Sequence, residues 1–555
     1  MTQRTVSETT WSVLETTHNR AAVSILVEAL DGPFAARATE ILLARRDVAG
    51  YRALLSRWSR LPQSCKEQLA ARAAPLSRAV RDAILGNDMQ LAVEGFDALL
   101  WLRDYDLIPA VVRAITERDG GLRELAEETL LTLCQQYEQT LRDRRRDAAS
   151  ERIDRRKEHV LDSLAQAAMR YDRHRRDKLV EAFLVLADHD HPQLAELLQN
   201  PHHKAFLPAL DILKHSTRDA VIDVLLHWMT ETRIPHCVPR IVAYRDDMPF
   251  IHRFLRFAGP EPSQRILANM RRAGDIKWLD GDVRVLELLP EDEQAALVRL
   301  AVASGMKRQR VFGILQEVLR RGKEPARRAA SEALQEFGGF EANQLVIQCL
   351  DDPDPVVQAN CVRQLRQRGV PGSITRLVAA LDSPHEETRQ AARESLGEFT
   401  FERFIMSFDL LDESVRKHVA ELVKRVDPTA ISALTRELRQ GLRTRRLRAV
   451  DAAIAMGIVD RVEPVLIEML TEEDHLVRAA AVRALAASTT DIARAAVQSA
   501  LQDEHPTVRD EAAAALESIG GHESPDDAPT PRLTELVDSA DWLRTNTPSH
   551  SPEST

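Results

Sequence analysis

The sequence predicts an all-α protein in which helix pairs stack into an α-solenoid. Three observations favour this fold. The 555 residues exceed what one compact core usually holds, so several domains or an array of repeats is expected. Aromatic residues make up only 5% of the chain, while Ala, Leu, Arg and Glu dominate, and this composition favours helix over strand. A pattern of residue types also returns about every 31 residues.

The repeat is clearest in the segment HPTVRDEAAAALESIG, which begins at His505. With Arg509 taken as an anchor, Val508 precedes it, Ala512 follows at +3 and Leu516 follows at +7. The same spacing recurs at intervals of 31, 33, 31, 31, 27, 30, 32 and 31 residues. In chain order the anchors are Ser263, Gln294, Arg327, Gln358, Arg389, Arg416, Arg446, Arg478 and Arg509. A period of this length indicates stacked supersecondary units.

Each unit has room for two helices. An apolar-periodic segment such as SITRLVAAL or RVEPVLIEML comes first, followed by a turn such as DDPDP or QDEHP and then by the anchored helix. Asp in the turn supplies an N-cap, and Pro occupies a position where a helix needs no N–H donor. We expect the small residue at +3 to let the second helix pack closely, and the residue at +7 to fill the seam between repeats.

These units resemble the HEAT-repeat family, in particular its short bacterial versions. The marks of that family are an Asp in the turn between the helices and an Arg six residues later, and in the family their side chains form a hydrogen-bonded ladder between repeats. Asp503 with Arg509 keeps this spacing, whereas Ser383 before Arg389 departs from it. The resemblance implies a solenoid whose ladder is interrupted.

The repeat pattern divides the chain into four regions. Residues 1–134 are predicted to hold degenerate repeats, and residues 259–520 regular ones. Residues 135–258 fit poorly and are either degenerate repeats or a helical insertion. Residues 521–555 are rich in Pro, Ser, Thr and Asp, which predicts a mostly disordered tail.

One short segment of the tail, PRLTELVDSADWLR, has a helical pattern. Its apolar residues recur at helical spacing, with Trp542 beside them: Leu533, Leu536, Val537, Ala540 and Leu543. This amphipathic helix could cap the exposed end of the solenoid, or it could dock into a groove of a partner.

The most favoured function is a non-enzymatic scaffold that binds a protein partner. The position five residues after each anchor should face outward on the second helix, which lines the concave surface in the HEAT family. This position is occupied by Glu332, Arg363, Glu394, Glu421, Asp451, Arg483 and Ala514. Arg363, Glu394, Glu421 and Arg483 are the predicted partner contacts, with Trp542 as a further candidate, although these charges could equally be ordinary solvated side chains.

A nucleic-acid-associated protein is the alternative. Positive charge is concentrated within residues 141–178, in LRDRRRDAASERIDRRKEHV and RYDRHRRDK, but acidic residues are interleaved at spacings that permit i,i+4 pairs. We therefore expect a long solvated helix that bridges two halves of the array. The net charge of −10 and the mixed signs at the outward position argue against a continuous basic ridge.

A metal-dependent enzyme is the third possibility. His189, His191, His202 and His203 lie in ADHDHPQLAELLQNPHHK, but they flank prolines in apparent turns and lack the i,i+4 or HExxH spacing of a metal helix. Di-iron hydroxylases built from similar repeats carry a motif like RHEAA, where this chain reads RDEAA at Arg509. We expect no catalytic residue, cofactor or metal.

The sequence also suggests a compartment. The first residues lack a basic segment followed by an apolar one, and no stretch approaches the length of a membrane span. We expect a cytoplasmic protein.

Overall fold

The computed structural model describes residues 8–17, 19–71, 74–146, 155–279, 284–440 and 442–520. It confirms the all-α fold, because every regular element within these residues is a helix. The described residues fall into two compact units, which divide between Val311 and Phe312. The division into four regions by repeat regularity stays a prediction. The amphipathic segment of the tail, with Trp542, lies outside the described residues.

The helices of the first unit are α1 (Glu8–Thr16), α2 (Ala21–Ala29), α3 (Ala35–Arg45), α4 (Val48–Leu55), η1 (Trp58–Arg60), α5 (Gln63–Ala71), α6 (Ala74–Leu85), α7 (Met89–Leu102), η2 (Tyr105–Leu107), α8 (Ile108–Glu117), α9 (Gly121–Arg146), α10 (Arg155–Met169), α11 (Tyr171–His174), α12 (Asp177–Leu186), α13 (Pro192–Gln199), α14 (Phe206–His215), α15 (Asp219–Trp228), α16 (Cys237–Tyr244), α17 (Met248–Ala258), α18 (Gln264–Met270), η3 (Lys277–Leu279), α19 (Arg284–Leu288) and α20 (Glu291–Ala303). Helix α21 (Arg308–Arg321) contains the boundary between the units.

The helices of the second unit that follow are α22 (Glu324–Ala333), η4 (Leu334–Glu336), α23 (Phe340–Gln348), η5 (Cys349–Asp351), α24 (Pro355–Leu365), α25 (Ser373–Ala380), α26 (Glu386–Ser395), α27 (Phe401–Ser407), η6 (Phe408–Leu410), α28 (Glu413–Val426), α29 (Ala430–Gln440), α30 (Arg443–Ala455), α31 (Val459–Met469), α32 (His475–Leu485), α33 (Asp491–Ala500) and α34 (Pro506–Gly520).

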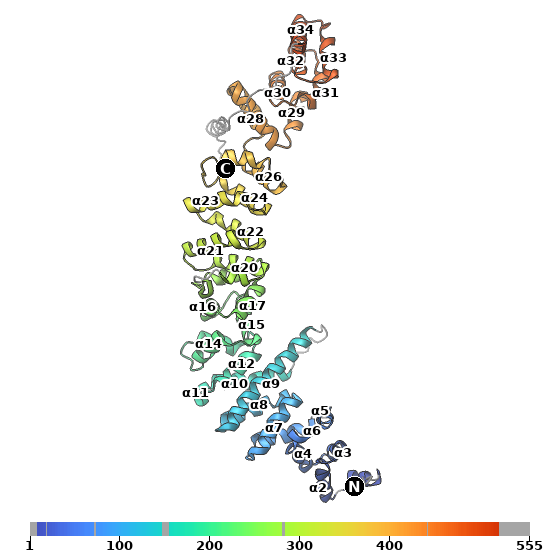
Figure 1. Cartoon of the computed structure of the whole chain (residues 1–555), viewed down its shortest axis with the longest axis vertical. Coiled ribbons are helices and arrows are strands. Elements are labelled where there is room, and N and C mark those ends of the chain that lie inside the picture. The colour runs from blue at the N-terminus through green and yellow to red at the C-terminus, as the bar shows by residue number, and fades with distance from the viewer. Residues whose placement is uncertain are drawn as a thin grey trace, which may run out of the picture. The chain divides into compact units, whose positions relative to one another are not determined.

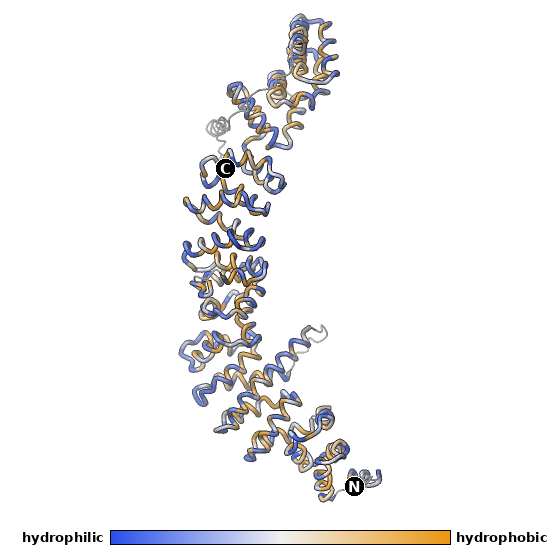
Figure 2. The backbone as a smooth tube through the Cα atoms, viewed as in Figure 1, coloured by the Kyte–Doolittle hydropathy of each residue, from blue (hydrophilic) through white to orange (hydrophobic). Residues whose placement is uncertain are grey.

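The second unit consists of helix pairs, as the repeat predicts. The second helices α22, α24 and α26 pack on one another in order, as do α28, α30, α32 and α34, and each of α24, α26, α28, α30, α32 and α34 packs on the first helix of its own pair (Figure 1). Most helices carry both hydrophilic and hydrophobic residues, as amphipathic helices should (Figure 2). The chain is therefore an α-solenoid.

The turns within the pairs use the predicted chemistry. Asp354 is the N-cap of α24 and accepts a hydrogen bond from the backbone N of Val356 at 3.0 Å, with Pro355 as the first helical residue. Asp474 caps α32 in the same way, at 2.9 Å from the backbone N of Leu476. Gly369, beyond α24, has φ of +62°, a conformation that favours glycine. These caps place the starts of α24 and α32 beside their turns.

The seam between the second helices is built from the +3 and +7 positions. The residues at +3 are at most 1% exposed: Ala330, Cys361, Ala392, Val419, Ala449, Ala481 and Ala512. The residues at +7 are fully buried in every repeat from α22 to α32: Leu334, Leu365, Leu396, Val423, Ala453 and Leu485. Small side chains at +3 allow the close approach that buries the larger ones at +7.

The anchor arginines connect successive turns. Arg478 is 5% exposed, and its Nη1 donates to the carbonyl oxygen of Glu472 at 2.7 Å in its own turn. Its Nε and Nη2 each donate to the carboxylate of Asp503 in the following turn, at 2.9 Å. Arg327 reaches Asp352 at 3.0 Å in the same way, and Arg446 reaches Glu472 at 2.7 Å. One guanidinium therefore links the turns of two repeats.

The ladder is interrupted, as the sequence implies. Gln358 binds its own turn through the carbonyl oxygen of Asp352 at 2.7 Å, but its link to the next repeat is a hydrogen bond from Thr388 at 3.1 Å. Arg389 binds the carbonyl oxygen of Ser383 at 2.6 Å and the carboxylate of Glu386 at 3.0 Å, both in its own repeat. A neutral hydrogen bond at Gln358 replaces the ion pair between repeats. At Arg389 the bonds stay within one repeat.

The first unit also contains helix pairs. Helices α7, α9, α12, α15, α17 and α20 pack on one another in order, while α6 and α8 pack on α7 and α9, and α10 and α14 on α12 and α15. These pairs run through residues 135–258, where the repeat pattern is weak. No helix in the described part of the chain is both long and apolar enough to cross a membrane.

The expectation of one bridging helix in the charged segment is wrong. The segment contributes to four helices: α9, which ends at Arg146, α10, which begins at Arg155, the short α11, and the first residues of α12. The reason is that α10 has its own apolar face. Val160, Leu164 and Ala168 are fully buried where α10 packs on α8 and α12.

Overpacking the seam should destabilise the second unit. Replacing the fully buried Ala481 by Leu adds volume where the second helices meet, and we expect a loss of about 1–3 kcal/mol in the free energy of unfolding. Urea unfolding followed by circular dichroism measures this loss. The exposed Ala379 is the control, since Ala379→Leu should change stability by less than about 0.5 kcal/mol. An equal loss of stability in Ala481→Leu and Ala379→Leu would show that the second helices are not closely packed at Ala481.

The ladder should make stability depend on pH. The hydrogen bonds from Arg478 lower the pKa of Asp503 below its usual value of about 3.9. A lowered pKa in the folded state stabilises the fold above the unfolded pKa, and this contribution is lost as the pH falls below about 4. Asp503→Asn should therefore lower the thermal unfolding midpoint at pH 7 and flatten its decline between about pH 5 and 3. If the unfolding midpoint of the Asp503→Asn variant declined between about pH 5 and 3 as steeply as that of the unsubstituted chain, the pair would not be coupled to folding.

Candidate functional site

The predicted contact residues of the second unit are exposed, and four of the charges at the outward position bind one another. Arg363 on α24 donates to Glu394 on α26 with its Nε 3.0 Å from the carboxylate. Arg483 on α32 binds Asp451 on α30 at 2.6 Å. Both pairs join neighbouring second helices, and the hydrogen bond from Arg363 lowers the pKa of Glu394. The outward position thus carries short ion pairs between repeats.

Glu421 on α28 is different, because it binds Lys424 within its own helix at 2.6 Å. Exposed ion pairs of this kind contribute about 0–1 kcal/mol, so a partner could replace them at little cost. The role of Arg363, Glu394, Glu421 and Arg483 as partner contacts stays a prediction. The same holds for Trp542, which lies outside the described residues.

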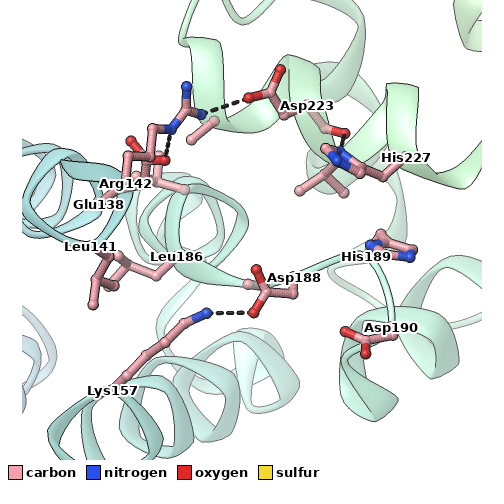
Figure 3. A pocket seen from close by; sticks show the side chains of 14 residues that line it. Glu138, Leu141, Arg142, Lys157, Leu186, Asp188, His189, Asp190, Asp223 and His227 are labelled. Carbon is pink, nitrogen blue, oxygen red and sulfur yellow. Dashed lines mark hydrogen bonds and ion pairs between the residues drawn. The ribbon is translucent and has the colours of Figure 1, made fainter. Parts of the chain in front are cut away.

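The first unit contains a pocket of about 500 Å³ between α9, α10, α12 and α15 (Figure 3). Its lining residues are Glu138, Leu141, Arg142, Lys157, Val185, Leu186, Ala187, Asp188, His189, Asp190, Ala220, Asp223, Val224 and His227. A second hollow of about 580 Å³ adjoins it and shares Glu138, Val185 and Ala220. Both lie along the row of second helices, within the region where the repeat pattern is weak.

The length of α9 explains the pocket. Helix α9 has 26 residues, whereas α12, on which it packs, has 10. The last turns of α9 bring Arg142 to Asp223 on α15, at 2.7 Å, while Arg142 also binds Glu138 one turn back on α9 (Figure 3). Arg253 on α17 holds the same Asp223 carboxylate at 2.8 Å. These bonds fix the mouth of the pocket between α9 and α15.

The pocket has an excess of negative charge. Four carboxylates line it, against one Arg and one Lys. Lys157 binds Asp188, and Arg142 is shared by Glu138 and Asp223 (Figure 3). Burial raises the pKa of the Glu138 carboxyl, and the bonds from Arg142 offset only part of this effect.

Asp190 is the remaining carboxylate of this lining. It is exposed and has no ion pair with any residue that the structure describes. A cationic group placed in the pocket would meet this carboxylate and would favour the charged form of Glu138.

The histidines do not converge on one point. The ring of His189 stacks on that of His227, with centroids 5.5 Å apart, whereas His191 packs edge-on against Phe183 at 5.3 Å. Burial lowers the pKa of His191, so this ring is neutral at pH 7. Within the described ranges, no three His, Cys, Asp or Glu side chains are placed to hold a metal ion.

The basic segment is only partly paired. In residues 141–178, Arg142, Lys157 and Lys178 bind carboxylates, the last at 3.0 Å from Glu181. Around α11, however, three exposed arginines have no ion pair in the described part of the chain: Arg170, Arg173 and Arg175. Among the described side chains of the segment, the arginines without an ion pair therefore gather around α11.

The sequence analysis selected His189 and the basic segment but missed the other side of the pocket. Asp219, Asp223 and His227 recur every four residues and therefore share one face of α15. This spacing was a signal that could have been found. Glu138 gives no such signal, since its place depends on where α9 meets α15.

Two stretches of the chain match a family of known repeats. Residues 313–397 and 462–547 match the family model of HEAT repeats. A comparison with curated proteins finds no match. The described residues include the whole of the first matched region and the second as far as Gly520.

Several solved structures resemble the chain weakly. An engineered protein is 16% identical, covers 90% of this chain and 99% of its own, and gives a TM-score of 0.18. Human deoxyhypusine hydroxylase in complex with glycerol is 18% identical, and the match covers 54% of this chain and 96% of the hydroxylase with a TM-score of 0.17. Kap121p is 13% identical, and the match covers 92% of this chain and 53% of Kap121p with a TM-score of 0.22. At these values the likeness carries no argument about the activity of this chain.

The purified chain should bind no stoichiometric metal at these histidines. His189 and His191 have separate aromatic neighbours, so they should not hold one ion together. Elemental analysis after dialysis against zinc, iron and manganese measures the metal content. One bound metal per chain, lost in His189→Ala and His191→Ala and kept in the control His215→Ala, would establish the metal site that we do not expect.

Proposed function

We propose that this HEAT-repeat chain is a non-enzymatic scaffold that binds protein partners. The contacts lie on its second helices, and the pocket between α9, α10, α12 and α15 takes a basic side chain of the partner. Arrays of this kind present long surfaces whose side chains are held in place by regular packing, which suits the recognition of proteins.

The charge of the pocket carries this proposal. Four carboxylates meet three basic groups, Arg142, Lys157 and Arg253 of α17, which leaves Asp190 without an ion pair among the described residues. The raised pKa of Glu138 adds to this, because a cation beside Glu138 would relieve the cost of burying its charge. A Lys or Arg side chain supplies that cation together with apolar methylene groups, which Leu141, Leu186 and Val224 can contact.

The geometry supports a preformed site. Arg142 and Arg253 hold Asp223 from two helices, and Lys157 holds Asp188. The walls therefore need little rearrangement when a partner binds, which lowers the entropic cost of association. The exposed pairs Arg363–Glu394 and Arg483–Asp451 supply further polar contacts on the second helices of the other unit.

Nucleic-acid binding is the second candidate, and the arginines around α11 favour it. Arg170, Arg173 and Arg175 are exposed and have no ion pair in the described ranges. Three basic side chains can neutralise phosphates and would give an affinity that falls with salt. They form a short group on one turn, however, so they supply fewer phosphate contacts than a basic ridge would.

Site-specific photo-crosslinking tests the scaffold. A benzophenone amino acid at Leu141, inside the pocket, should crosslink a protein in nuclease-treated native lysate, whereas the same group at the 69% exposed Leu207 on α14 should not. Asp190→Lys reverses the open charge of the pocket and should reduce the crosslinked product by about tenfold, as loss of a charge pair predicts.

The matched control is Glu196→Lys, which makes the same charge change on an exposed residue of α13 outside the pocket and should leave the product unchanged. Mass spectrometry of the product should find the crosslink beside a Lys or Arg of the partner. Product that disappears with nuclease would favour the nucleic-acid candidate. An equal yield from Leu141 and Leu207 would rule the pocket out as the binding site.

A further inference from the structure

The last second helix, α34, has an uncovered face. Leu516 occupies its +7 position and is half-buried, whereas Leu485, at +7 in the preceding repeat, is fully buried. On the neighbouring first helix, α33, Ile492 is 65% exposed, and Leu501 just beyond it is 36% exposed. We call Ile492, Leu501, Arg509 and Leu516 the terminal face. A further repeat would cover this face, as each repeat covers the one before it.

The anchor of α34 also lacks the bond to a following turn that Arg327, Arg446 and Arg478 make. Nη1 of Arg509 donates to the carbonyl oxygens of Asp503 and Glu504 at 2.7 and 3.0 Å, which matches the bonds of Arg478 to its own turn at 2.7 and 3.0 Å. Arg478 then binds the carboxylate of Asp503 in the next turn. Arg509 has no carboxylate partner among the residues that the structure describes.

We infer that residues 531–544 dock on the terminal face as a closing repeat, in which Glu535 accepts the free guanidinium bonds of Arg509. Glu535 is the carboxylate that falls at a ladder spacing, which is 25 residues for Arg327–Asp352 and Arg478–Asp503 and 26 for Arg446–Glu472. Arg446 binds Glu472, which lies 26 residues later, and Glu535 lies 26 residues after Arg509. The apolar residues Leu533, Leu536 and Leu543 fall on one side of a helix and would cover Leu516 and Ile492.

Two further observations select this segment as the occupant. The family match in the second unit extends from residue 462 to residue 547, past the end of α34 at Gly520 and through the whole segment. The first match, over residues 313–397, contains three second helices, whereas residues 462–520 contain only α32 and α34. A third repeat is therefore expected after Gly520.

The connection is long enough for this docking. About a dozen residues separate Gly520 from Leu533, and an extended chain of that length spans at most about 40 Å. Helix α34 has 15 residues and is about 22 Å long. The chain can therefore return along α34 and place the segment on the terminal face.

Hydrogen exchange in the full-length chain tests this inference. Leu536→Asp places a charge in the apolar contact, and we expect the amides of α33 and α34 to exchange about tenfold faster or more. The control is Glu553→Arg, which changes a charge of the tail outside the segment and should leave exchange unchanged. Exchange in α23 and α24, far along the chain from the terminal face, should stay the same in every variant.

A charge swap tests the ladder contact separately from the apolar one. Arg509→Glu and Glu535→Arg should each speed exchange in α33 and α34, and the double variant should recover much of the protection, because the ion pair is restored with its signs reversed. Additive effects of the two substitutions would overturn the contact. Protection that is unaffected by Leu536→Asp would overturn the docking. Protection that rises with chain concentration would assign the terminal face to a second copy of the chain instead.

Discussion

The bond between an anchor guanidinium and the carboxylate of the following turn links successive repeats at Arg327, Arg446 and Arg478, and it is the constraint that fixes the spacing of the turns there. Arg478 shows its full form, with one end on the carbonyl oxygens of its own turn and the other on Asp503. This bond sets the distance between two turns and hence between the second helices that begin there. At that distance only a small residue fits at +3, and Ala481 meets the condition with no exposed surface. The same approach buries Leu485 at +7. Leu365 and Leu396 are equally buried in the repeats that lack the ion pair, so the apolar seam also forms where the polar link is missing.

The interruptions of the ladder have physical consequences of their own. At Gln358 a neutral bond from Thr388 replaces the ion pair, and at Arg389 the guanidinium stays within its own repeat. The interval between anchors also shortens there, from 31 residues to 27 between Arg389 and Arg416. In a repeat array the stability is close to a sum of nearest-neighbour terms, so a weak junction lowers cooperativity locally without abolishing the fold. Between α24 and α26 the exposed ion pair Arg363–Glu394 contributes only a small amount to the stability.

Much of the architecture could be predicted from the sequence because a repeat determines position. The period identified which residues would be buried at +3 and +7 and which would face outward at +5, and Ala481, Leu485 and Arg483 lie as expected. The side-chain partners could not be predicted. That Arg483 binds Asp451 depends on the offset between two helices, which a periodic pattern does not specify. The pocket was missed for a related reason, since it exists because α9 runs past its short neighbour α12 and reaches Asp223. In the charged segment the composition suggested one helix, whereas α10 is a separate helix with its own apolar face.

Partner binding depends on the same regularity, because a scaffold can present fixed surfaces only if its repeats hold one another in place. The most direct test is a double-mutant cycle on Arg478 and Asp503 in the full-length chain, with the free energy of unfolding of the second unit measured for Arg478→Ala, Asp503→Ala and the double variant. We expect a coupling energy of at least about 1 kcal/mol, because the pair is largely buried and bidentate. Single-variant losses that add to within about 0.3 kcal/mol would show that the turns are not linked through this bond, and would contradict the account.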